Sequence, residues 1–194
     1  MQQQIQDDLK SAQAVHRALA EDTALHEQLA GLAAWCLDAL RQGGKILFAG
    51  NGGSFADAQH LAAEFVSRLQ FDRAPLPAIA LATNSSSMSA IGNDYGYEQV
   101  FARELRAVAS PHDVFIPITT SGNSPNIMAA VKVAQEISIR TMGFTGESGG
   151  KLAVVCPCLR VPSSRTERIQ EGHILLGHIL CAQVETAYFK GRTS

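Results

Sequence analysis

The sequence lacks a strong excess of either charge. It has 16 Lys and Arg residues against 18 Asp and Glu, for a formal net charge of -2 at pH 7, so electrostatics give no reason to expect nucleic acid or an anionic membrane as partner. It also lacks an apolar run near the roughly 20 residues that a membrane span needs. The first eight residues, MQQQIQDD, are too polar and acidic for a secretory signal. These absences predict a soluble, cytoplasmic protein with no nucleic-acid partner and no membrane partner.

Cysteine is also scarce. The four cysteines are Cys36, Cys156, Cys158 and Cys181, and all have apolar neighbours. The spacing of Cys156-Pro157-Cys158 is too short for a zinc motif or a thioredoxin-type motif. We therefore expect buried thiols without a redox or metal-binding role.

The length of 194 residues suits one α/β domain and makes two domains unfavourable. Two helical patterns come first, at about 5–20 and 25–40, and Asp22-Thr23 is a candidate cap for the second. Gly43-Gly44 then ends that helix. The sequence thus predicts an N-terminal helical extension over 1–42 and an α/β core with its C-terminal helix over 43–194, all within one domain.

From Lys45 onward, short apolar runs alternate with helical patterns. We expect strands at 46–49, 77–81, 114–118, 141–144 and 154–161. We expect helices at 56–69, 85–91, 97–108, 126–137 and 166–190. Pro117 has no N–H to donate and should lie near the end of its strand. This alternation predicts an α/β fold: a three-layer sandwich whose five-stranded parallel sheet is flanked by helices, with an N-terminal helical pair and a long C-terminal helix.

The first strand leads into Gly50-Asn51-Gly52-Gly53-Ser54, directly before a helix. Free backbone N–H groups converge at such a turn and can bind an anion. The glycines allow positive φ and close approach of a ligand, and Ser54 adds a hydroxyl. The loop matches neither the dinucleotide fingerprint nor the Walker pattern. The alternative is a tight turn with Ser54 as a helix cap.

The third strand leads into Thr119-Thr120-Ser121-Gly122-Asn123-Ser124-Pro125. Four hydroxyls lie around a glycine just before a helix, so this loop can hold phosphate oxygens without a basic residue. Pro125 suits the first turn of that helix. The alternative is an ordinary capping loop, but four hydroxyls in six residues favour ligand binding.

Two pairs of residues distant in sequence suggest a metal site. His60 and Glu64 are spaced i, i+4 on one helical face, and Gln170 and His178 are about two turns apart on the last helix. Two His, one Glu and one Gln make a mixed N/O site for a divalent ion, zinc among the candidates. The alternative is that the histidines are structural and Glu64 exposed. His173, about 140° from His178 around its helix, is expected to be structural.

One further segment and three arginines have side chains that could bind a ligand. Asn93-Asp94 could cap the helix that follows or bind sugar hydroxyls. Arg73, Arg165 and Arg168 are expected to be surface charges.

At this point the residues match a known family. The chain resembles the sedoheptulose-7-phosphate isomerases (phosphoheptose isomerases) of the sugar isomerase (SIS) domain superfamily over nearly its whole length. The motifs that carry the resemblance are Gly50 to Ser54, Asp57-Ala58-Gln59-His60 with Glu64, Gly92-Asn93-Asp94, Thr120 to Ser124, and Arg168-Ile169-Gln170-Glu171 followed by His178. The two loops occur across the superfamily, whereas the joined His60, Glu64, Gln170 and His178 set is more specific.

The resemblance implies a homotetramer that converts sedoheptulose 7-phosphate to glycero-manno-heptose 7-phosphate, the first step toward the ADP- or GDP-heptose used in lipopolysaccharide, capsule and other surface glycans. It implies one zinc per subunit, held by His60, Glu64, Gln170 and His178. It implies substrate contacts at Asn51, Gly52, Gly53, Glu64, Asn93, Asp94, Thr119, Thr120, Ser121, Ser124 and Gln170, to which we add Ser54 for its hydroxyl. Thr119 stands where the family usually has Ser, and Glu167 stands at a variable position and is given no role.

The chemistry of such an isomerase assigns roles to two of these residues. Moving a carbonyl from C2 to C1 through an enediol needs a base and an acid. Glu64 is expected to be the base and His178 the acid. One rival hypothesis is a non-catalytic SIS-domain binding protein of the replication-initiator-associating type, whose relatives lack this complete set. A second rival is an isomerase or sensor of another sugar phosphate.

Overall fold

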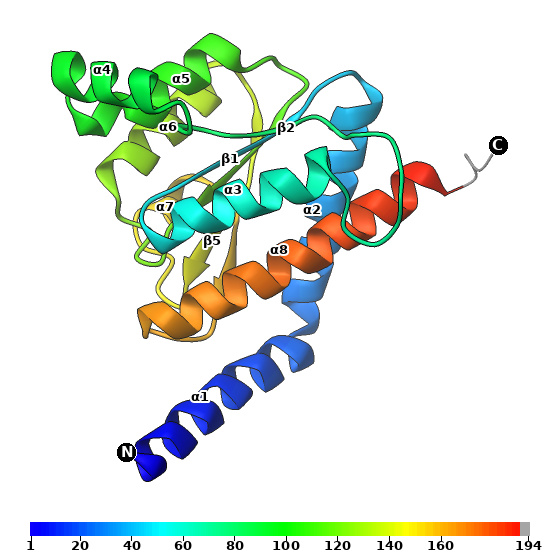
Figure 1. The fold of residues 1–194 in the computed structure, drawn as a ribbon, viewed down its shortest axis with the longest axis vertical. Coiled ribbons are helices and arrows are strands. Elements are labelled where there is room, and N and C mark those ends of the chain that lie inside the picture. Colours follow the sequence, from blue (N-terminus) through cyan, green and yellow to red (C-terminus); the bar gives the residue numbers. More distant parts are fainter. Residues whose placement is uncertain (191–194) are drawn as a thin grey trace.

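Two helices, α1 (Gln2–Glu21) and α2 (Thr23–Arg41), precede the sheet and meet at Asp22. In the computed structural model, which describes residues 1–190, the Asp22 side chain accepts a hydrogen bond from the backbone N–H of Leu25 at 2.9 Å and caps α2 as predicted. Figure 1 shows α1 extending away from the rest of the molecule. Ile5 and Leu9 on this helix are 59% and 60% exposed.

The sheet is parallel, and its main path has the five strands that the sequence predicts, in the order β2-β1-β3-β5-β6. Their bounds are β1 (Ile46–Gly50), β2 (Ala78–Ala80), β3 (Val114–Ile118), β5 (Gly143–Gly146) and β6 (Cys158–Val161). A sixth strand, the two-residue β4 (Arg140–Thr141), pairs with the start of β3. The strand expected at 141–144 is therefore divided into β4 and β5.

Pro117 explains this division. The carbonyl of Phe115 accepts from the N–H of Met142 at 3.2 Å, and the N–H of Thr119 donates to Phe144 at 3.0 Å. Alternate residues of a strand face the same neighbour, so Pro117 faces this side too but has no N–H to donate. The ladder between β3 and its neighbour is interrupted at this point, one residue before β3 ends.

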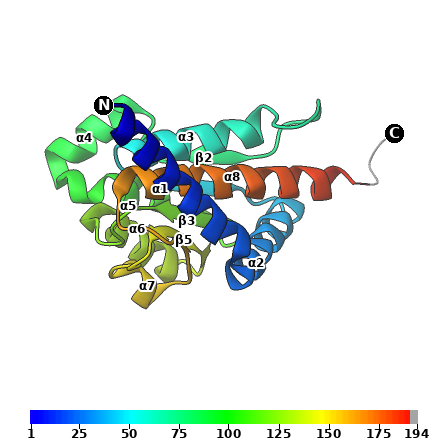
Figure 2. The same ribbon diagram turned by 90° about the horizontal axis from the view of Figure 1, so that it is seen from below.

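Alternate residues of the strands pack into two apolar layers, one on each face of the sheet. Ile46 and Phe48 pack with α1, α2, α3 and α8 on one face, whereas Leu47 and Ala49 pack with α5 and α6 on the other. Figure 2 shows the sheet between these two groups of helices. The prediction of a three-layer α/β sandwich is confirmed.

The remaining helices are α3 (Gly53–Val66), α4 (Ser85–Tyr95), the 3₁₀ turn η1 (Tyr97–Gln99), α5 (Val100–Val108), α6 (Pro125–Glu136), α7 (Leu152–Val155) and α8 (Thr166–Phe189). The strand expected at 154–161 is wrong in its first half. Val154 and Val155 favour a strand by propensity, but they are 85% and 40% exposed in α7, whose Leu152 is fully buried. α3 begins three residues earlier than expected and ends three residues earlier. The predicted range 43–194 includes 191–194, which lie outside the described residues.

α8 runs along the face that α2 and α3 also cover, and it lies beside α3 in both views (Figure 1, Figure 2). His173 on α8 is fully buried against Phe144, with ring centroids 5.8 Å apart. Neither of its ring nitrogens has a hydrogen-bond partner among residues 1–190. This is the structural role expected from its place on the helix. Within the described chain, no helix has the length and hydropathy needed to cross a membrane.

Burial of His173 makes the fold sensitive to acid. Burial lowers the pKa of this imidazole from 6.5 to about 4. Between these values the unfolded chain holds a proton that the folded chain lacks, so the free energy of unfolding falls as pH falls. The difference corresponds to about 3 kcal/mol lost by pH 4. Urea titrations at pH 7 and pH 4.5 should show that His173→Leu removes most of this loss.

The matched control for that experiment is His112→Gln, because His112 is exposed. It should leave the acid sensitivity of the wild type unchanged. Equal acid sensitivity in wild type and His173→Leu would show that other groups cause the loss.

Candidate functional site

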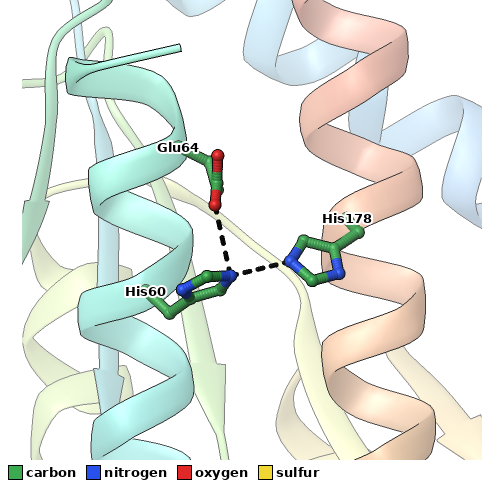
Figure 3. A group of neighbouring side chains, drawn as sticks. All are labelled: His60, Glu64 and His178. Carbon is green, nitrogen blue, oxygen red and sulfur yellow. Dashed lines mark hydrogen bonds and ion pairs between the residues drawn. The ribbon is translucent and has the colours of Figure 1, made fainter. Parts of the chain in front are cut away.

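Three side chains from two helices converge on one point (Figure 3). His60 and Glu64 lie on α3 and His178 on α8. The Nε2 atom of His60 is 2.8 Å from Nε2 of His178 and 3.2 Å from Oε1 of Glu64. The two imidazole rings meet edge to face, with centroids 5.0 Å apart. The structure thus brings together three of the four residues proposed from sequence as metal ligands.

The close approach of α3 and α8 makes this convergence possible. A Cβ atom on Gly177 would come within 2.6 Å of both terminal methyls of Leu61, so glycine lets the helices pack at this distance. One turn further along α8, Cys181 lies with its Sγ 3.9 Å from the carbonyl of Leu61. Burial raises the pKa of this thiol well above its ordinary range, which agrees with the expected packing role.

The cluster has the donors of a divalent-metal site. One ligand atom from each of His60, Glu64 and His178 can be chosen so that all three lie within 4.8 Å of one another. Zinc–ligand bonds of about 2.0–2.2 Å place neighbouring tetrahedral ligand atoms roughly 3.3–3.6 Å apart, which small side-chain rotations would reach here. Imidazole nitrogen and carboxylate oxygen suit zinc and other first-row divalent ions.

Gln170 lies on α8 two turns before His178, against the start of α3. A Cβ atom on Gly53 would be 2.3 Å from its Nε2 and 2.9 Å from its Oε1. The amide is therefore packed on the backbone of the first loop. The proposed ligand role of Gln170 stays a prediction, because this contact is with Gly53 rather than with the three-residue cluster.

The first loop, from Gly50 to Ser54, is held by the backbone conformation of Gly52 and by hydrogen bonds to the side chain of Asn51. Gly52 caps the N-terminus of α3 with φ +57°, a conformation that favours glycine. The amides of Asn51 and Asn126 exchange two hydrogen bonds of 2.9 Å, and the Tyr97 hydroxyl donates to Asn51 at 3.2 Å. Ser54 is 3% exposed and packs beside Gly50 rather than facing solvent.

The second loop keeps its hydroxyls close to the N-terminus of α6. The hydroxyls of Thr119 and Ser124 lie 3.1 Å apart. Ser124 is the N-cap of α6, yet its side chain makes no capping hydrogen bond within the described chain. Ser121 is exposed, and its Oγ accepts the N–H of Asn123 at 3.1 Å. Thr120 is half-buried beside it, so the loop presents hydroxyls next to a helix N-terminus, as predicted.

Asn93 and Asp94 lie within the last turn of α4, so the alternative in which they cap the following helix is wrong. Both are exposed, and Asn93 donates to the Asp94 carboxylate at 2.8 Å. The sequence pattern ended this helix at Ile91, whereas the chain continues it to Tyr95 before Gly96 turns the backbone at φ +85°.

The expectation of three surface arginines holds only for Arg165, whose side chain is 48% exposed and pairs with Asp8 on α1. Arg168 is 12% exposed and Arg73 only 2%. Arg73 is paired with a buried carboxylate, a partner that lies 112 positions away and that no local pattern indicates.

The comparisons with known proteins agree with this geometry. The model of the SIS domain family matches residues 9–146. The chain is 48% identical over 193 residues to a phosphoheptose isomerase of Aneurinibacillus thermoaerophilus, covering 99% of this chain and 98% of that protein. It is 49% identical over 186 residues to one of Burkholderia pseudomallei, covering 95% and 94%. The chain belongs to the phosphoheptose isomerase family.

A solved phosphoheptose isomerase from Neisseria gonorrhoeae has the same fold, with a TM-score of 0.88 at 40% identity over 95% of this chain and 98% of that one. The one from Francisella tularensis aligns with a TM-score of 0.89 at 34% identity, over 95% and 97%.

Sequence reasoning gave no role to three residues that lie beside the first loop and the His60–Glu64–His178 cluster. Asn126 and Tyr97 hold the side chain of Asn51, and no local pattern pairs them with the first loop. Asp57 stands in one of the motifs that carry the family resemblance but was assigned no role. It lies one turn before His60 on α3, and the i, i+3 spacing was a usable signal. Burial raises the pKa of Asp57 to about 6, while the nearby His60 opposes the rise.

The three-residue cluster should bind a divalent metal ion. Cobalt is a suitable probe, because the weak visible absorption of hydrated Co²⁺ becomes stronger and shifts when protein ligands replace water in a four-coordinate site. We expect one Co²⁺ per chain, with at least tenfold weaker binding in His60→Ala, which removes a ligand. His112→Ala, at an exposed histidine, should bind as the wild type does. Equal binding by all three proteins would rule out the cluster as the metal site.

Proposed function

We propose that the protein is an aldose–ketose isomerase that converts D-sedoheptulose 7-phosphate to D-glycero-D-manno-heptose 7-phosphate. The observation that carries the proposal is the convergence of Glu64, His60 and His178 between α3 and α8. Membership of the phosphoheptose isomerase family supports the choice of substrate.

The reaction needs one proton removed from C1 and one delivered to C2, with the oxygens exchanging a proton through an enediol. Glu64 is the base in this proposal. Its side chain is 17% exposed, so it is shielded from bulk water yet reachable by a small ligand. His178 is the acid, because an imidazole can donate and accept at neutral pH. His60 contacts both and orients them.

The four predicted ligands, His60, Glu64, Gln170 and His178, suit one zinc per subunit. When bound there, zinc would polarise the carbonyl and hydroxyl oxygens at C1 and C2. Glu64 has two roles in this scheme that compete, because a carboxylate held tightly by a metal is a weaker base. The scheme therefore requires that the carboxylate of Glu64 bind zinc weakly or shift during turnover.

The phosphate is assigned to the second loop. Thr119, Thr120, Ser121 and Ser124 supply hydroxyls beside the N-terminus of α6, where free N–H groups and the helix dipole favour an anion. The sugar is assigned to the first loop, with Asn51, Gly52, Gly53 and Ser54, and to Asn93, Asp94 and Gln170. Because the side chain of Ser54 is buried, its contact is assigned to its backbone N–H at the start of α3 rather than to its hydroxyl. Because the side chain of Asn51 is occupied by Asn126 and Tyr97, its contact with the sugar is assigned to its backbone.

The wider setting is also proposed from the family. The product would enter ADP- or GDP-heptose synthesis for lipopolysaccharide or capsule in the cytoplasm. The assembly would be a homotetramer of one SIS domain per chain. The exposed Ile5 and Leu9 on the projecting helix α1 support contacts between copies.

The direct test is to incubate the purified full chain with sedoheptulose 7-phosphate and zinc and to follow the aldose C1 proton by NMR. Fructose 6-phosphate serves as the control substrate, and it should react far more slowly. Preferred turnover of fructose 6-phosphate would favour another sugar-phosphate isomerase. No turnover of either sugar, together with no metal binding, would favour the non-catalytic binding protein.

The two assigned proton-transfer residues should be needed for turnover. Glu64→Gln and His178→Gln each keep the size of the side chain but remove the acid–base group. We expect each to lower kcat at least ~100-fold, the low end of a general acid–base contribution. Steady-state kinetics measure the loss of kcat. The control is Glu98→Gln, at an exposed glutamate, which should keep the wild-type rate. A near-wild-type rate in either variant would remove that residue from the mechanism.

The contact between Gly53 and Gln170 gives a further test. An alanine Cβ at position 53 would displace the Gln170 amide, which is the flexible end of a side chain, so the fold should tolerate it. We expect Gly53→Ala to lower kcat/KM about tenfold or more with a nearly unchanged melting temperature. Gly31→Ala, where no atom lies within 4 Å of the added Cβ, is the matched control. Wild-type kinetics in Gly53→Ala would show that the placement of Gln170 is unimportant.

A further inference from the structure

Arg73 caps the end of the helix that carries the base. It lies on the loop after α3, and its Nη2 donates to the backbone carbonyl of Glu64 at 2.8 Å. Its Nη1 donates to the carbonyls of Phe65, Ser67 and Ala74 at 2.7, 3.0 and 3.1 Å. Carbonyls in the last turn of a helix lack their usual partners, and a cation there is favourable. Arg73 thus holds the backbone of Glu64 itself.

Glu185 holds the same loop from α8. Its Oε1 accepts from Nε of Arg73 at 2.9 Å and from the N–H of Leu69 at 3.0 Å, and its Oε2 accepts from the N–H of Gln70 at 2.8 Å. Its side chain is 1% exposed. Burial alone would raise the pKa of this carboxyl, but the two amide hydrogen bonds and Arg73 lower it below its ordinary value. The side chain is therefore a buried carboxylate with its oxygens occupied.

We propose that the buried Arg73–Glu185 pair is a positioning pair for the active site, which fixes Glu64 on α3 relative to His178 on α8. The proposal rests on the proposed function, because it concerns the placing of the base and the acid. Glu185 lies seven residues after His178, about two turns along the same helix. The link from His178 to Glu64 therefore runs through one helix, one buried ion pair and one backbone hydrogen bond.

Packing fixes α3 against α8 before the Glu64 position. Gln170 lies on Gly53 at the start of α3, and Leu61 meets Gly177 one turn before Glu64. The Arg73–Glu185 pair joins the two helices on the other side of Glu64 and His178, and its hydrogen bonds are directional. Contacts on both sides of these two residues set the relative rotation of α3 and α8, and with it the separation of the side chains between them.

Stability alone does not account for such a pair. The free energy needed to remove two charges from water is similar in size to the attraction between them in a buried ion pair. Apolar residues of similar size therefore often stabilise a fold equally well. Charge-assisted hydrogen bonds from the rigid, planar guanidinium instead give geometric specificity. Arg73 and Glu185 make seven hydrogen bonds: six join a side chain to backbone atoms, and one joins the two side chains to each other. This is the arrangement expected of a group that sets backbone position.

Two variants test the pair in the full-length protein. Glu185→Gln keeps the shape but removes the charge, and Arg73→Lys keeps the charge but cannot reach the same carbonyls. We expect each to lower kcat about tenfold or more while KM stays within about twofold, because the substrate-binding loops are untouched. Zinc affinity, measured by competition with a chelator, should fall about tenfold in both.

The matched control is Asp113→Asn. The Asp113 carboxylate is also fully buried and binds Nζ of Lys45 at 2.8 Å, but it lies at the opposite, amino end of β3. This variant should lower the melting temperature while kcat and zinc affinity stay within about twofold of the wild type. It separates loss of positioning from loss of stability.

Three outcomes are distinguishable. Wild-type kcat and zinc affinity in folded Glu185→Gln and Arg73→Lys would overturn the positioning role. So would an equal loss in Asp113→Asn, because general destabilisation would then explain the effect. A wild type without turnover and without zinc binding would overturn the proposed function itself. If Glu185→Gln does not fold, Arg73→Lys decides alone.

Discussion

The close packing of α3 against α8 is the constraint on which the site depends. His60 and Glu64 are one turn apart on α3, but neither can meet His178 unless the two helices approach closely. Gly177 permits that approach, since any larger residue would collide with Leu61. The separation of two helices, rather than the shape of a loop, therefore sets the geometry of the three-residue cluster.

The two loops of the candidate site follow two neighbouring strands of the sheet, β1 and β3. β1 and β3 are adjacent and parallel, so their carboxyl ends deliver both glycine-containing loops to one edge, where ligands of such folds bind. The first loop passes into α3 and hence to the cluster of His60, Glu64 and His178 that is proposed for acid–base catalysis, and the second passes into α6. A substrate with a phosphate at one end and a carbonyl at the other fits this separation of the proposed anion site from the proposed proton-transfer site.

The sequence predicted what local spacing encodes. The i, i+4 pair of His60 and Glu64, the hydroxyl loop and the alternation of strands and helices were all readable from neighbours in the chain. The strand predicted at Val154 and Val155 was wrong, because strand propensity does not take into account that the buried side chain of Leu152 holds this segment in a helical turn. Arg73 was wrongly predicted to be a surface charge for a related reason. Its partner, Glu185, lies 112 residues later on α8. Long-range pairs of this kind carry no local signal.

The edges of the sheet bear on how copies of the chain can meet. The edge strands β2 and β6 have only three and four residues. Pro77 directly precedes β2, and exposed Arg160 lies within β6. Short edges with proline and charge are poor templates for a further strand, so they protect against edge-to-edge aggregation. Helical surfaces, among them the projecting α1, are left as the faces through which the protein can associate in an ordered way.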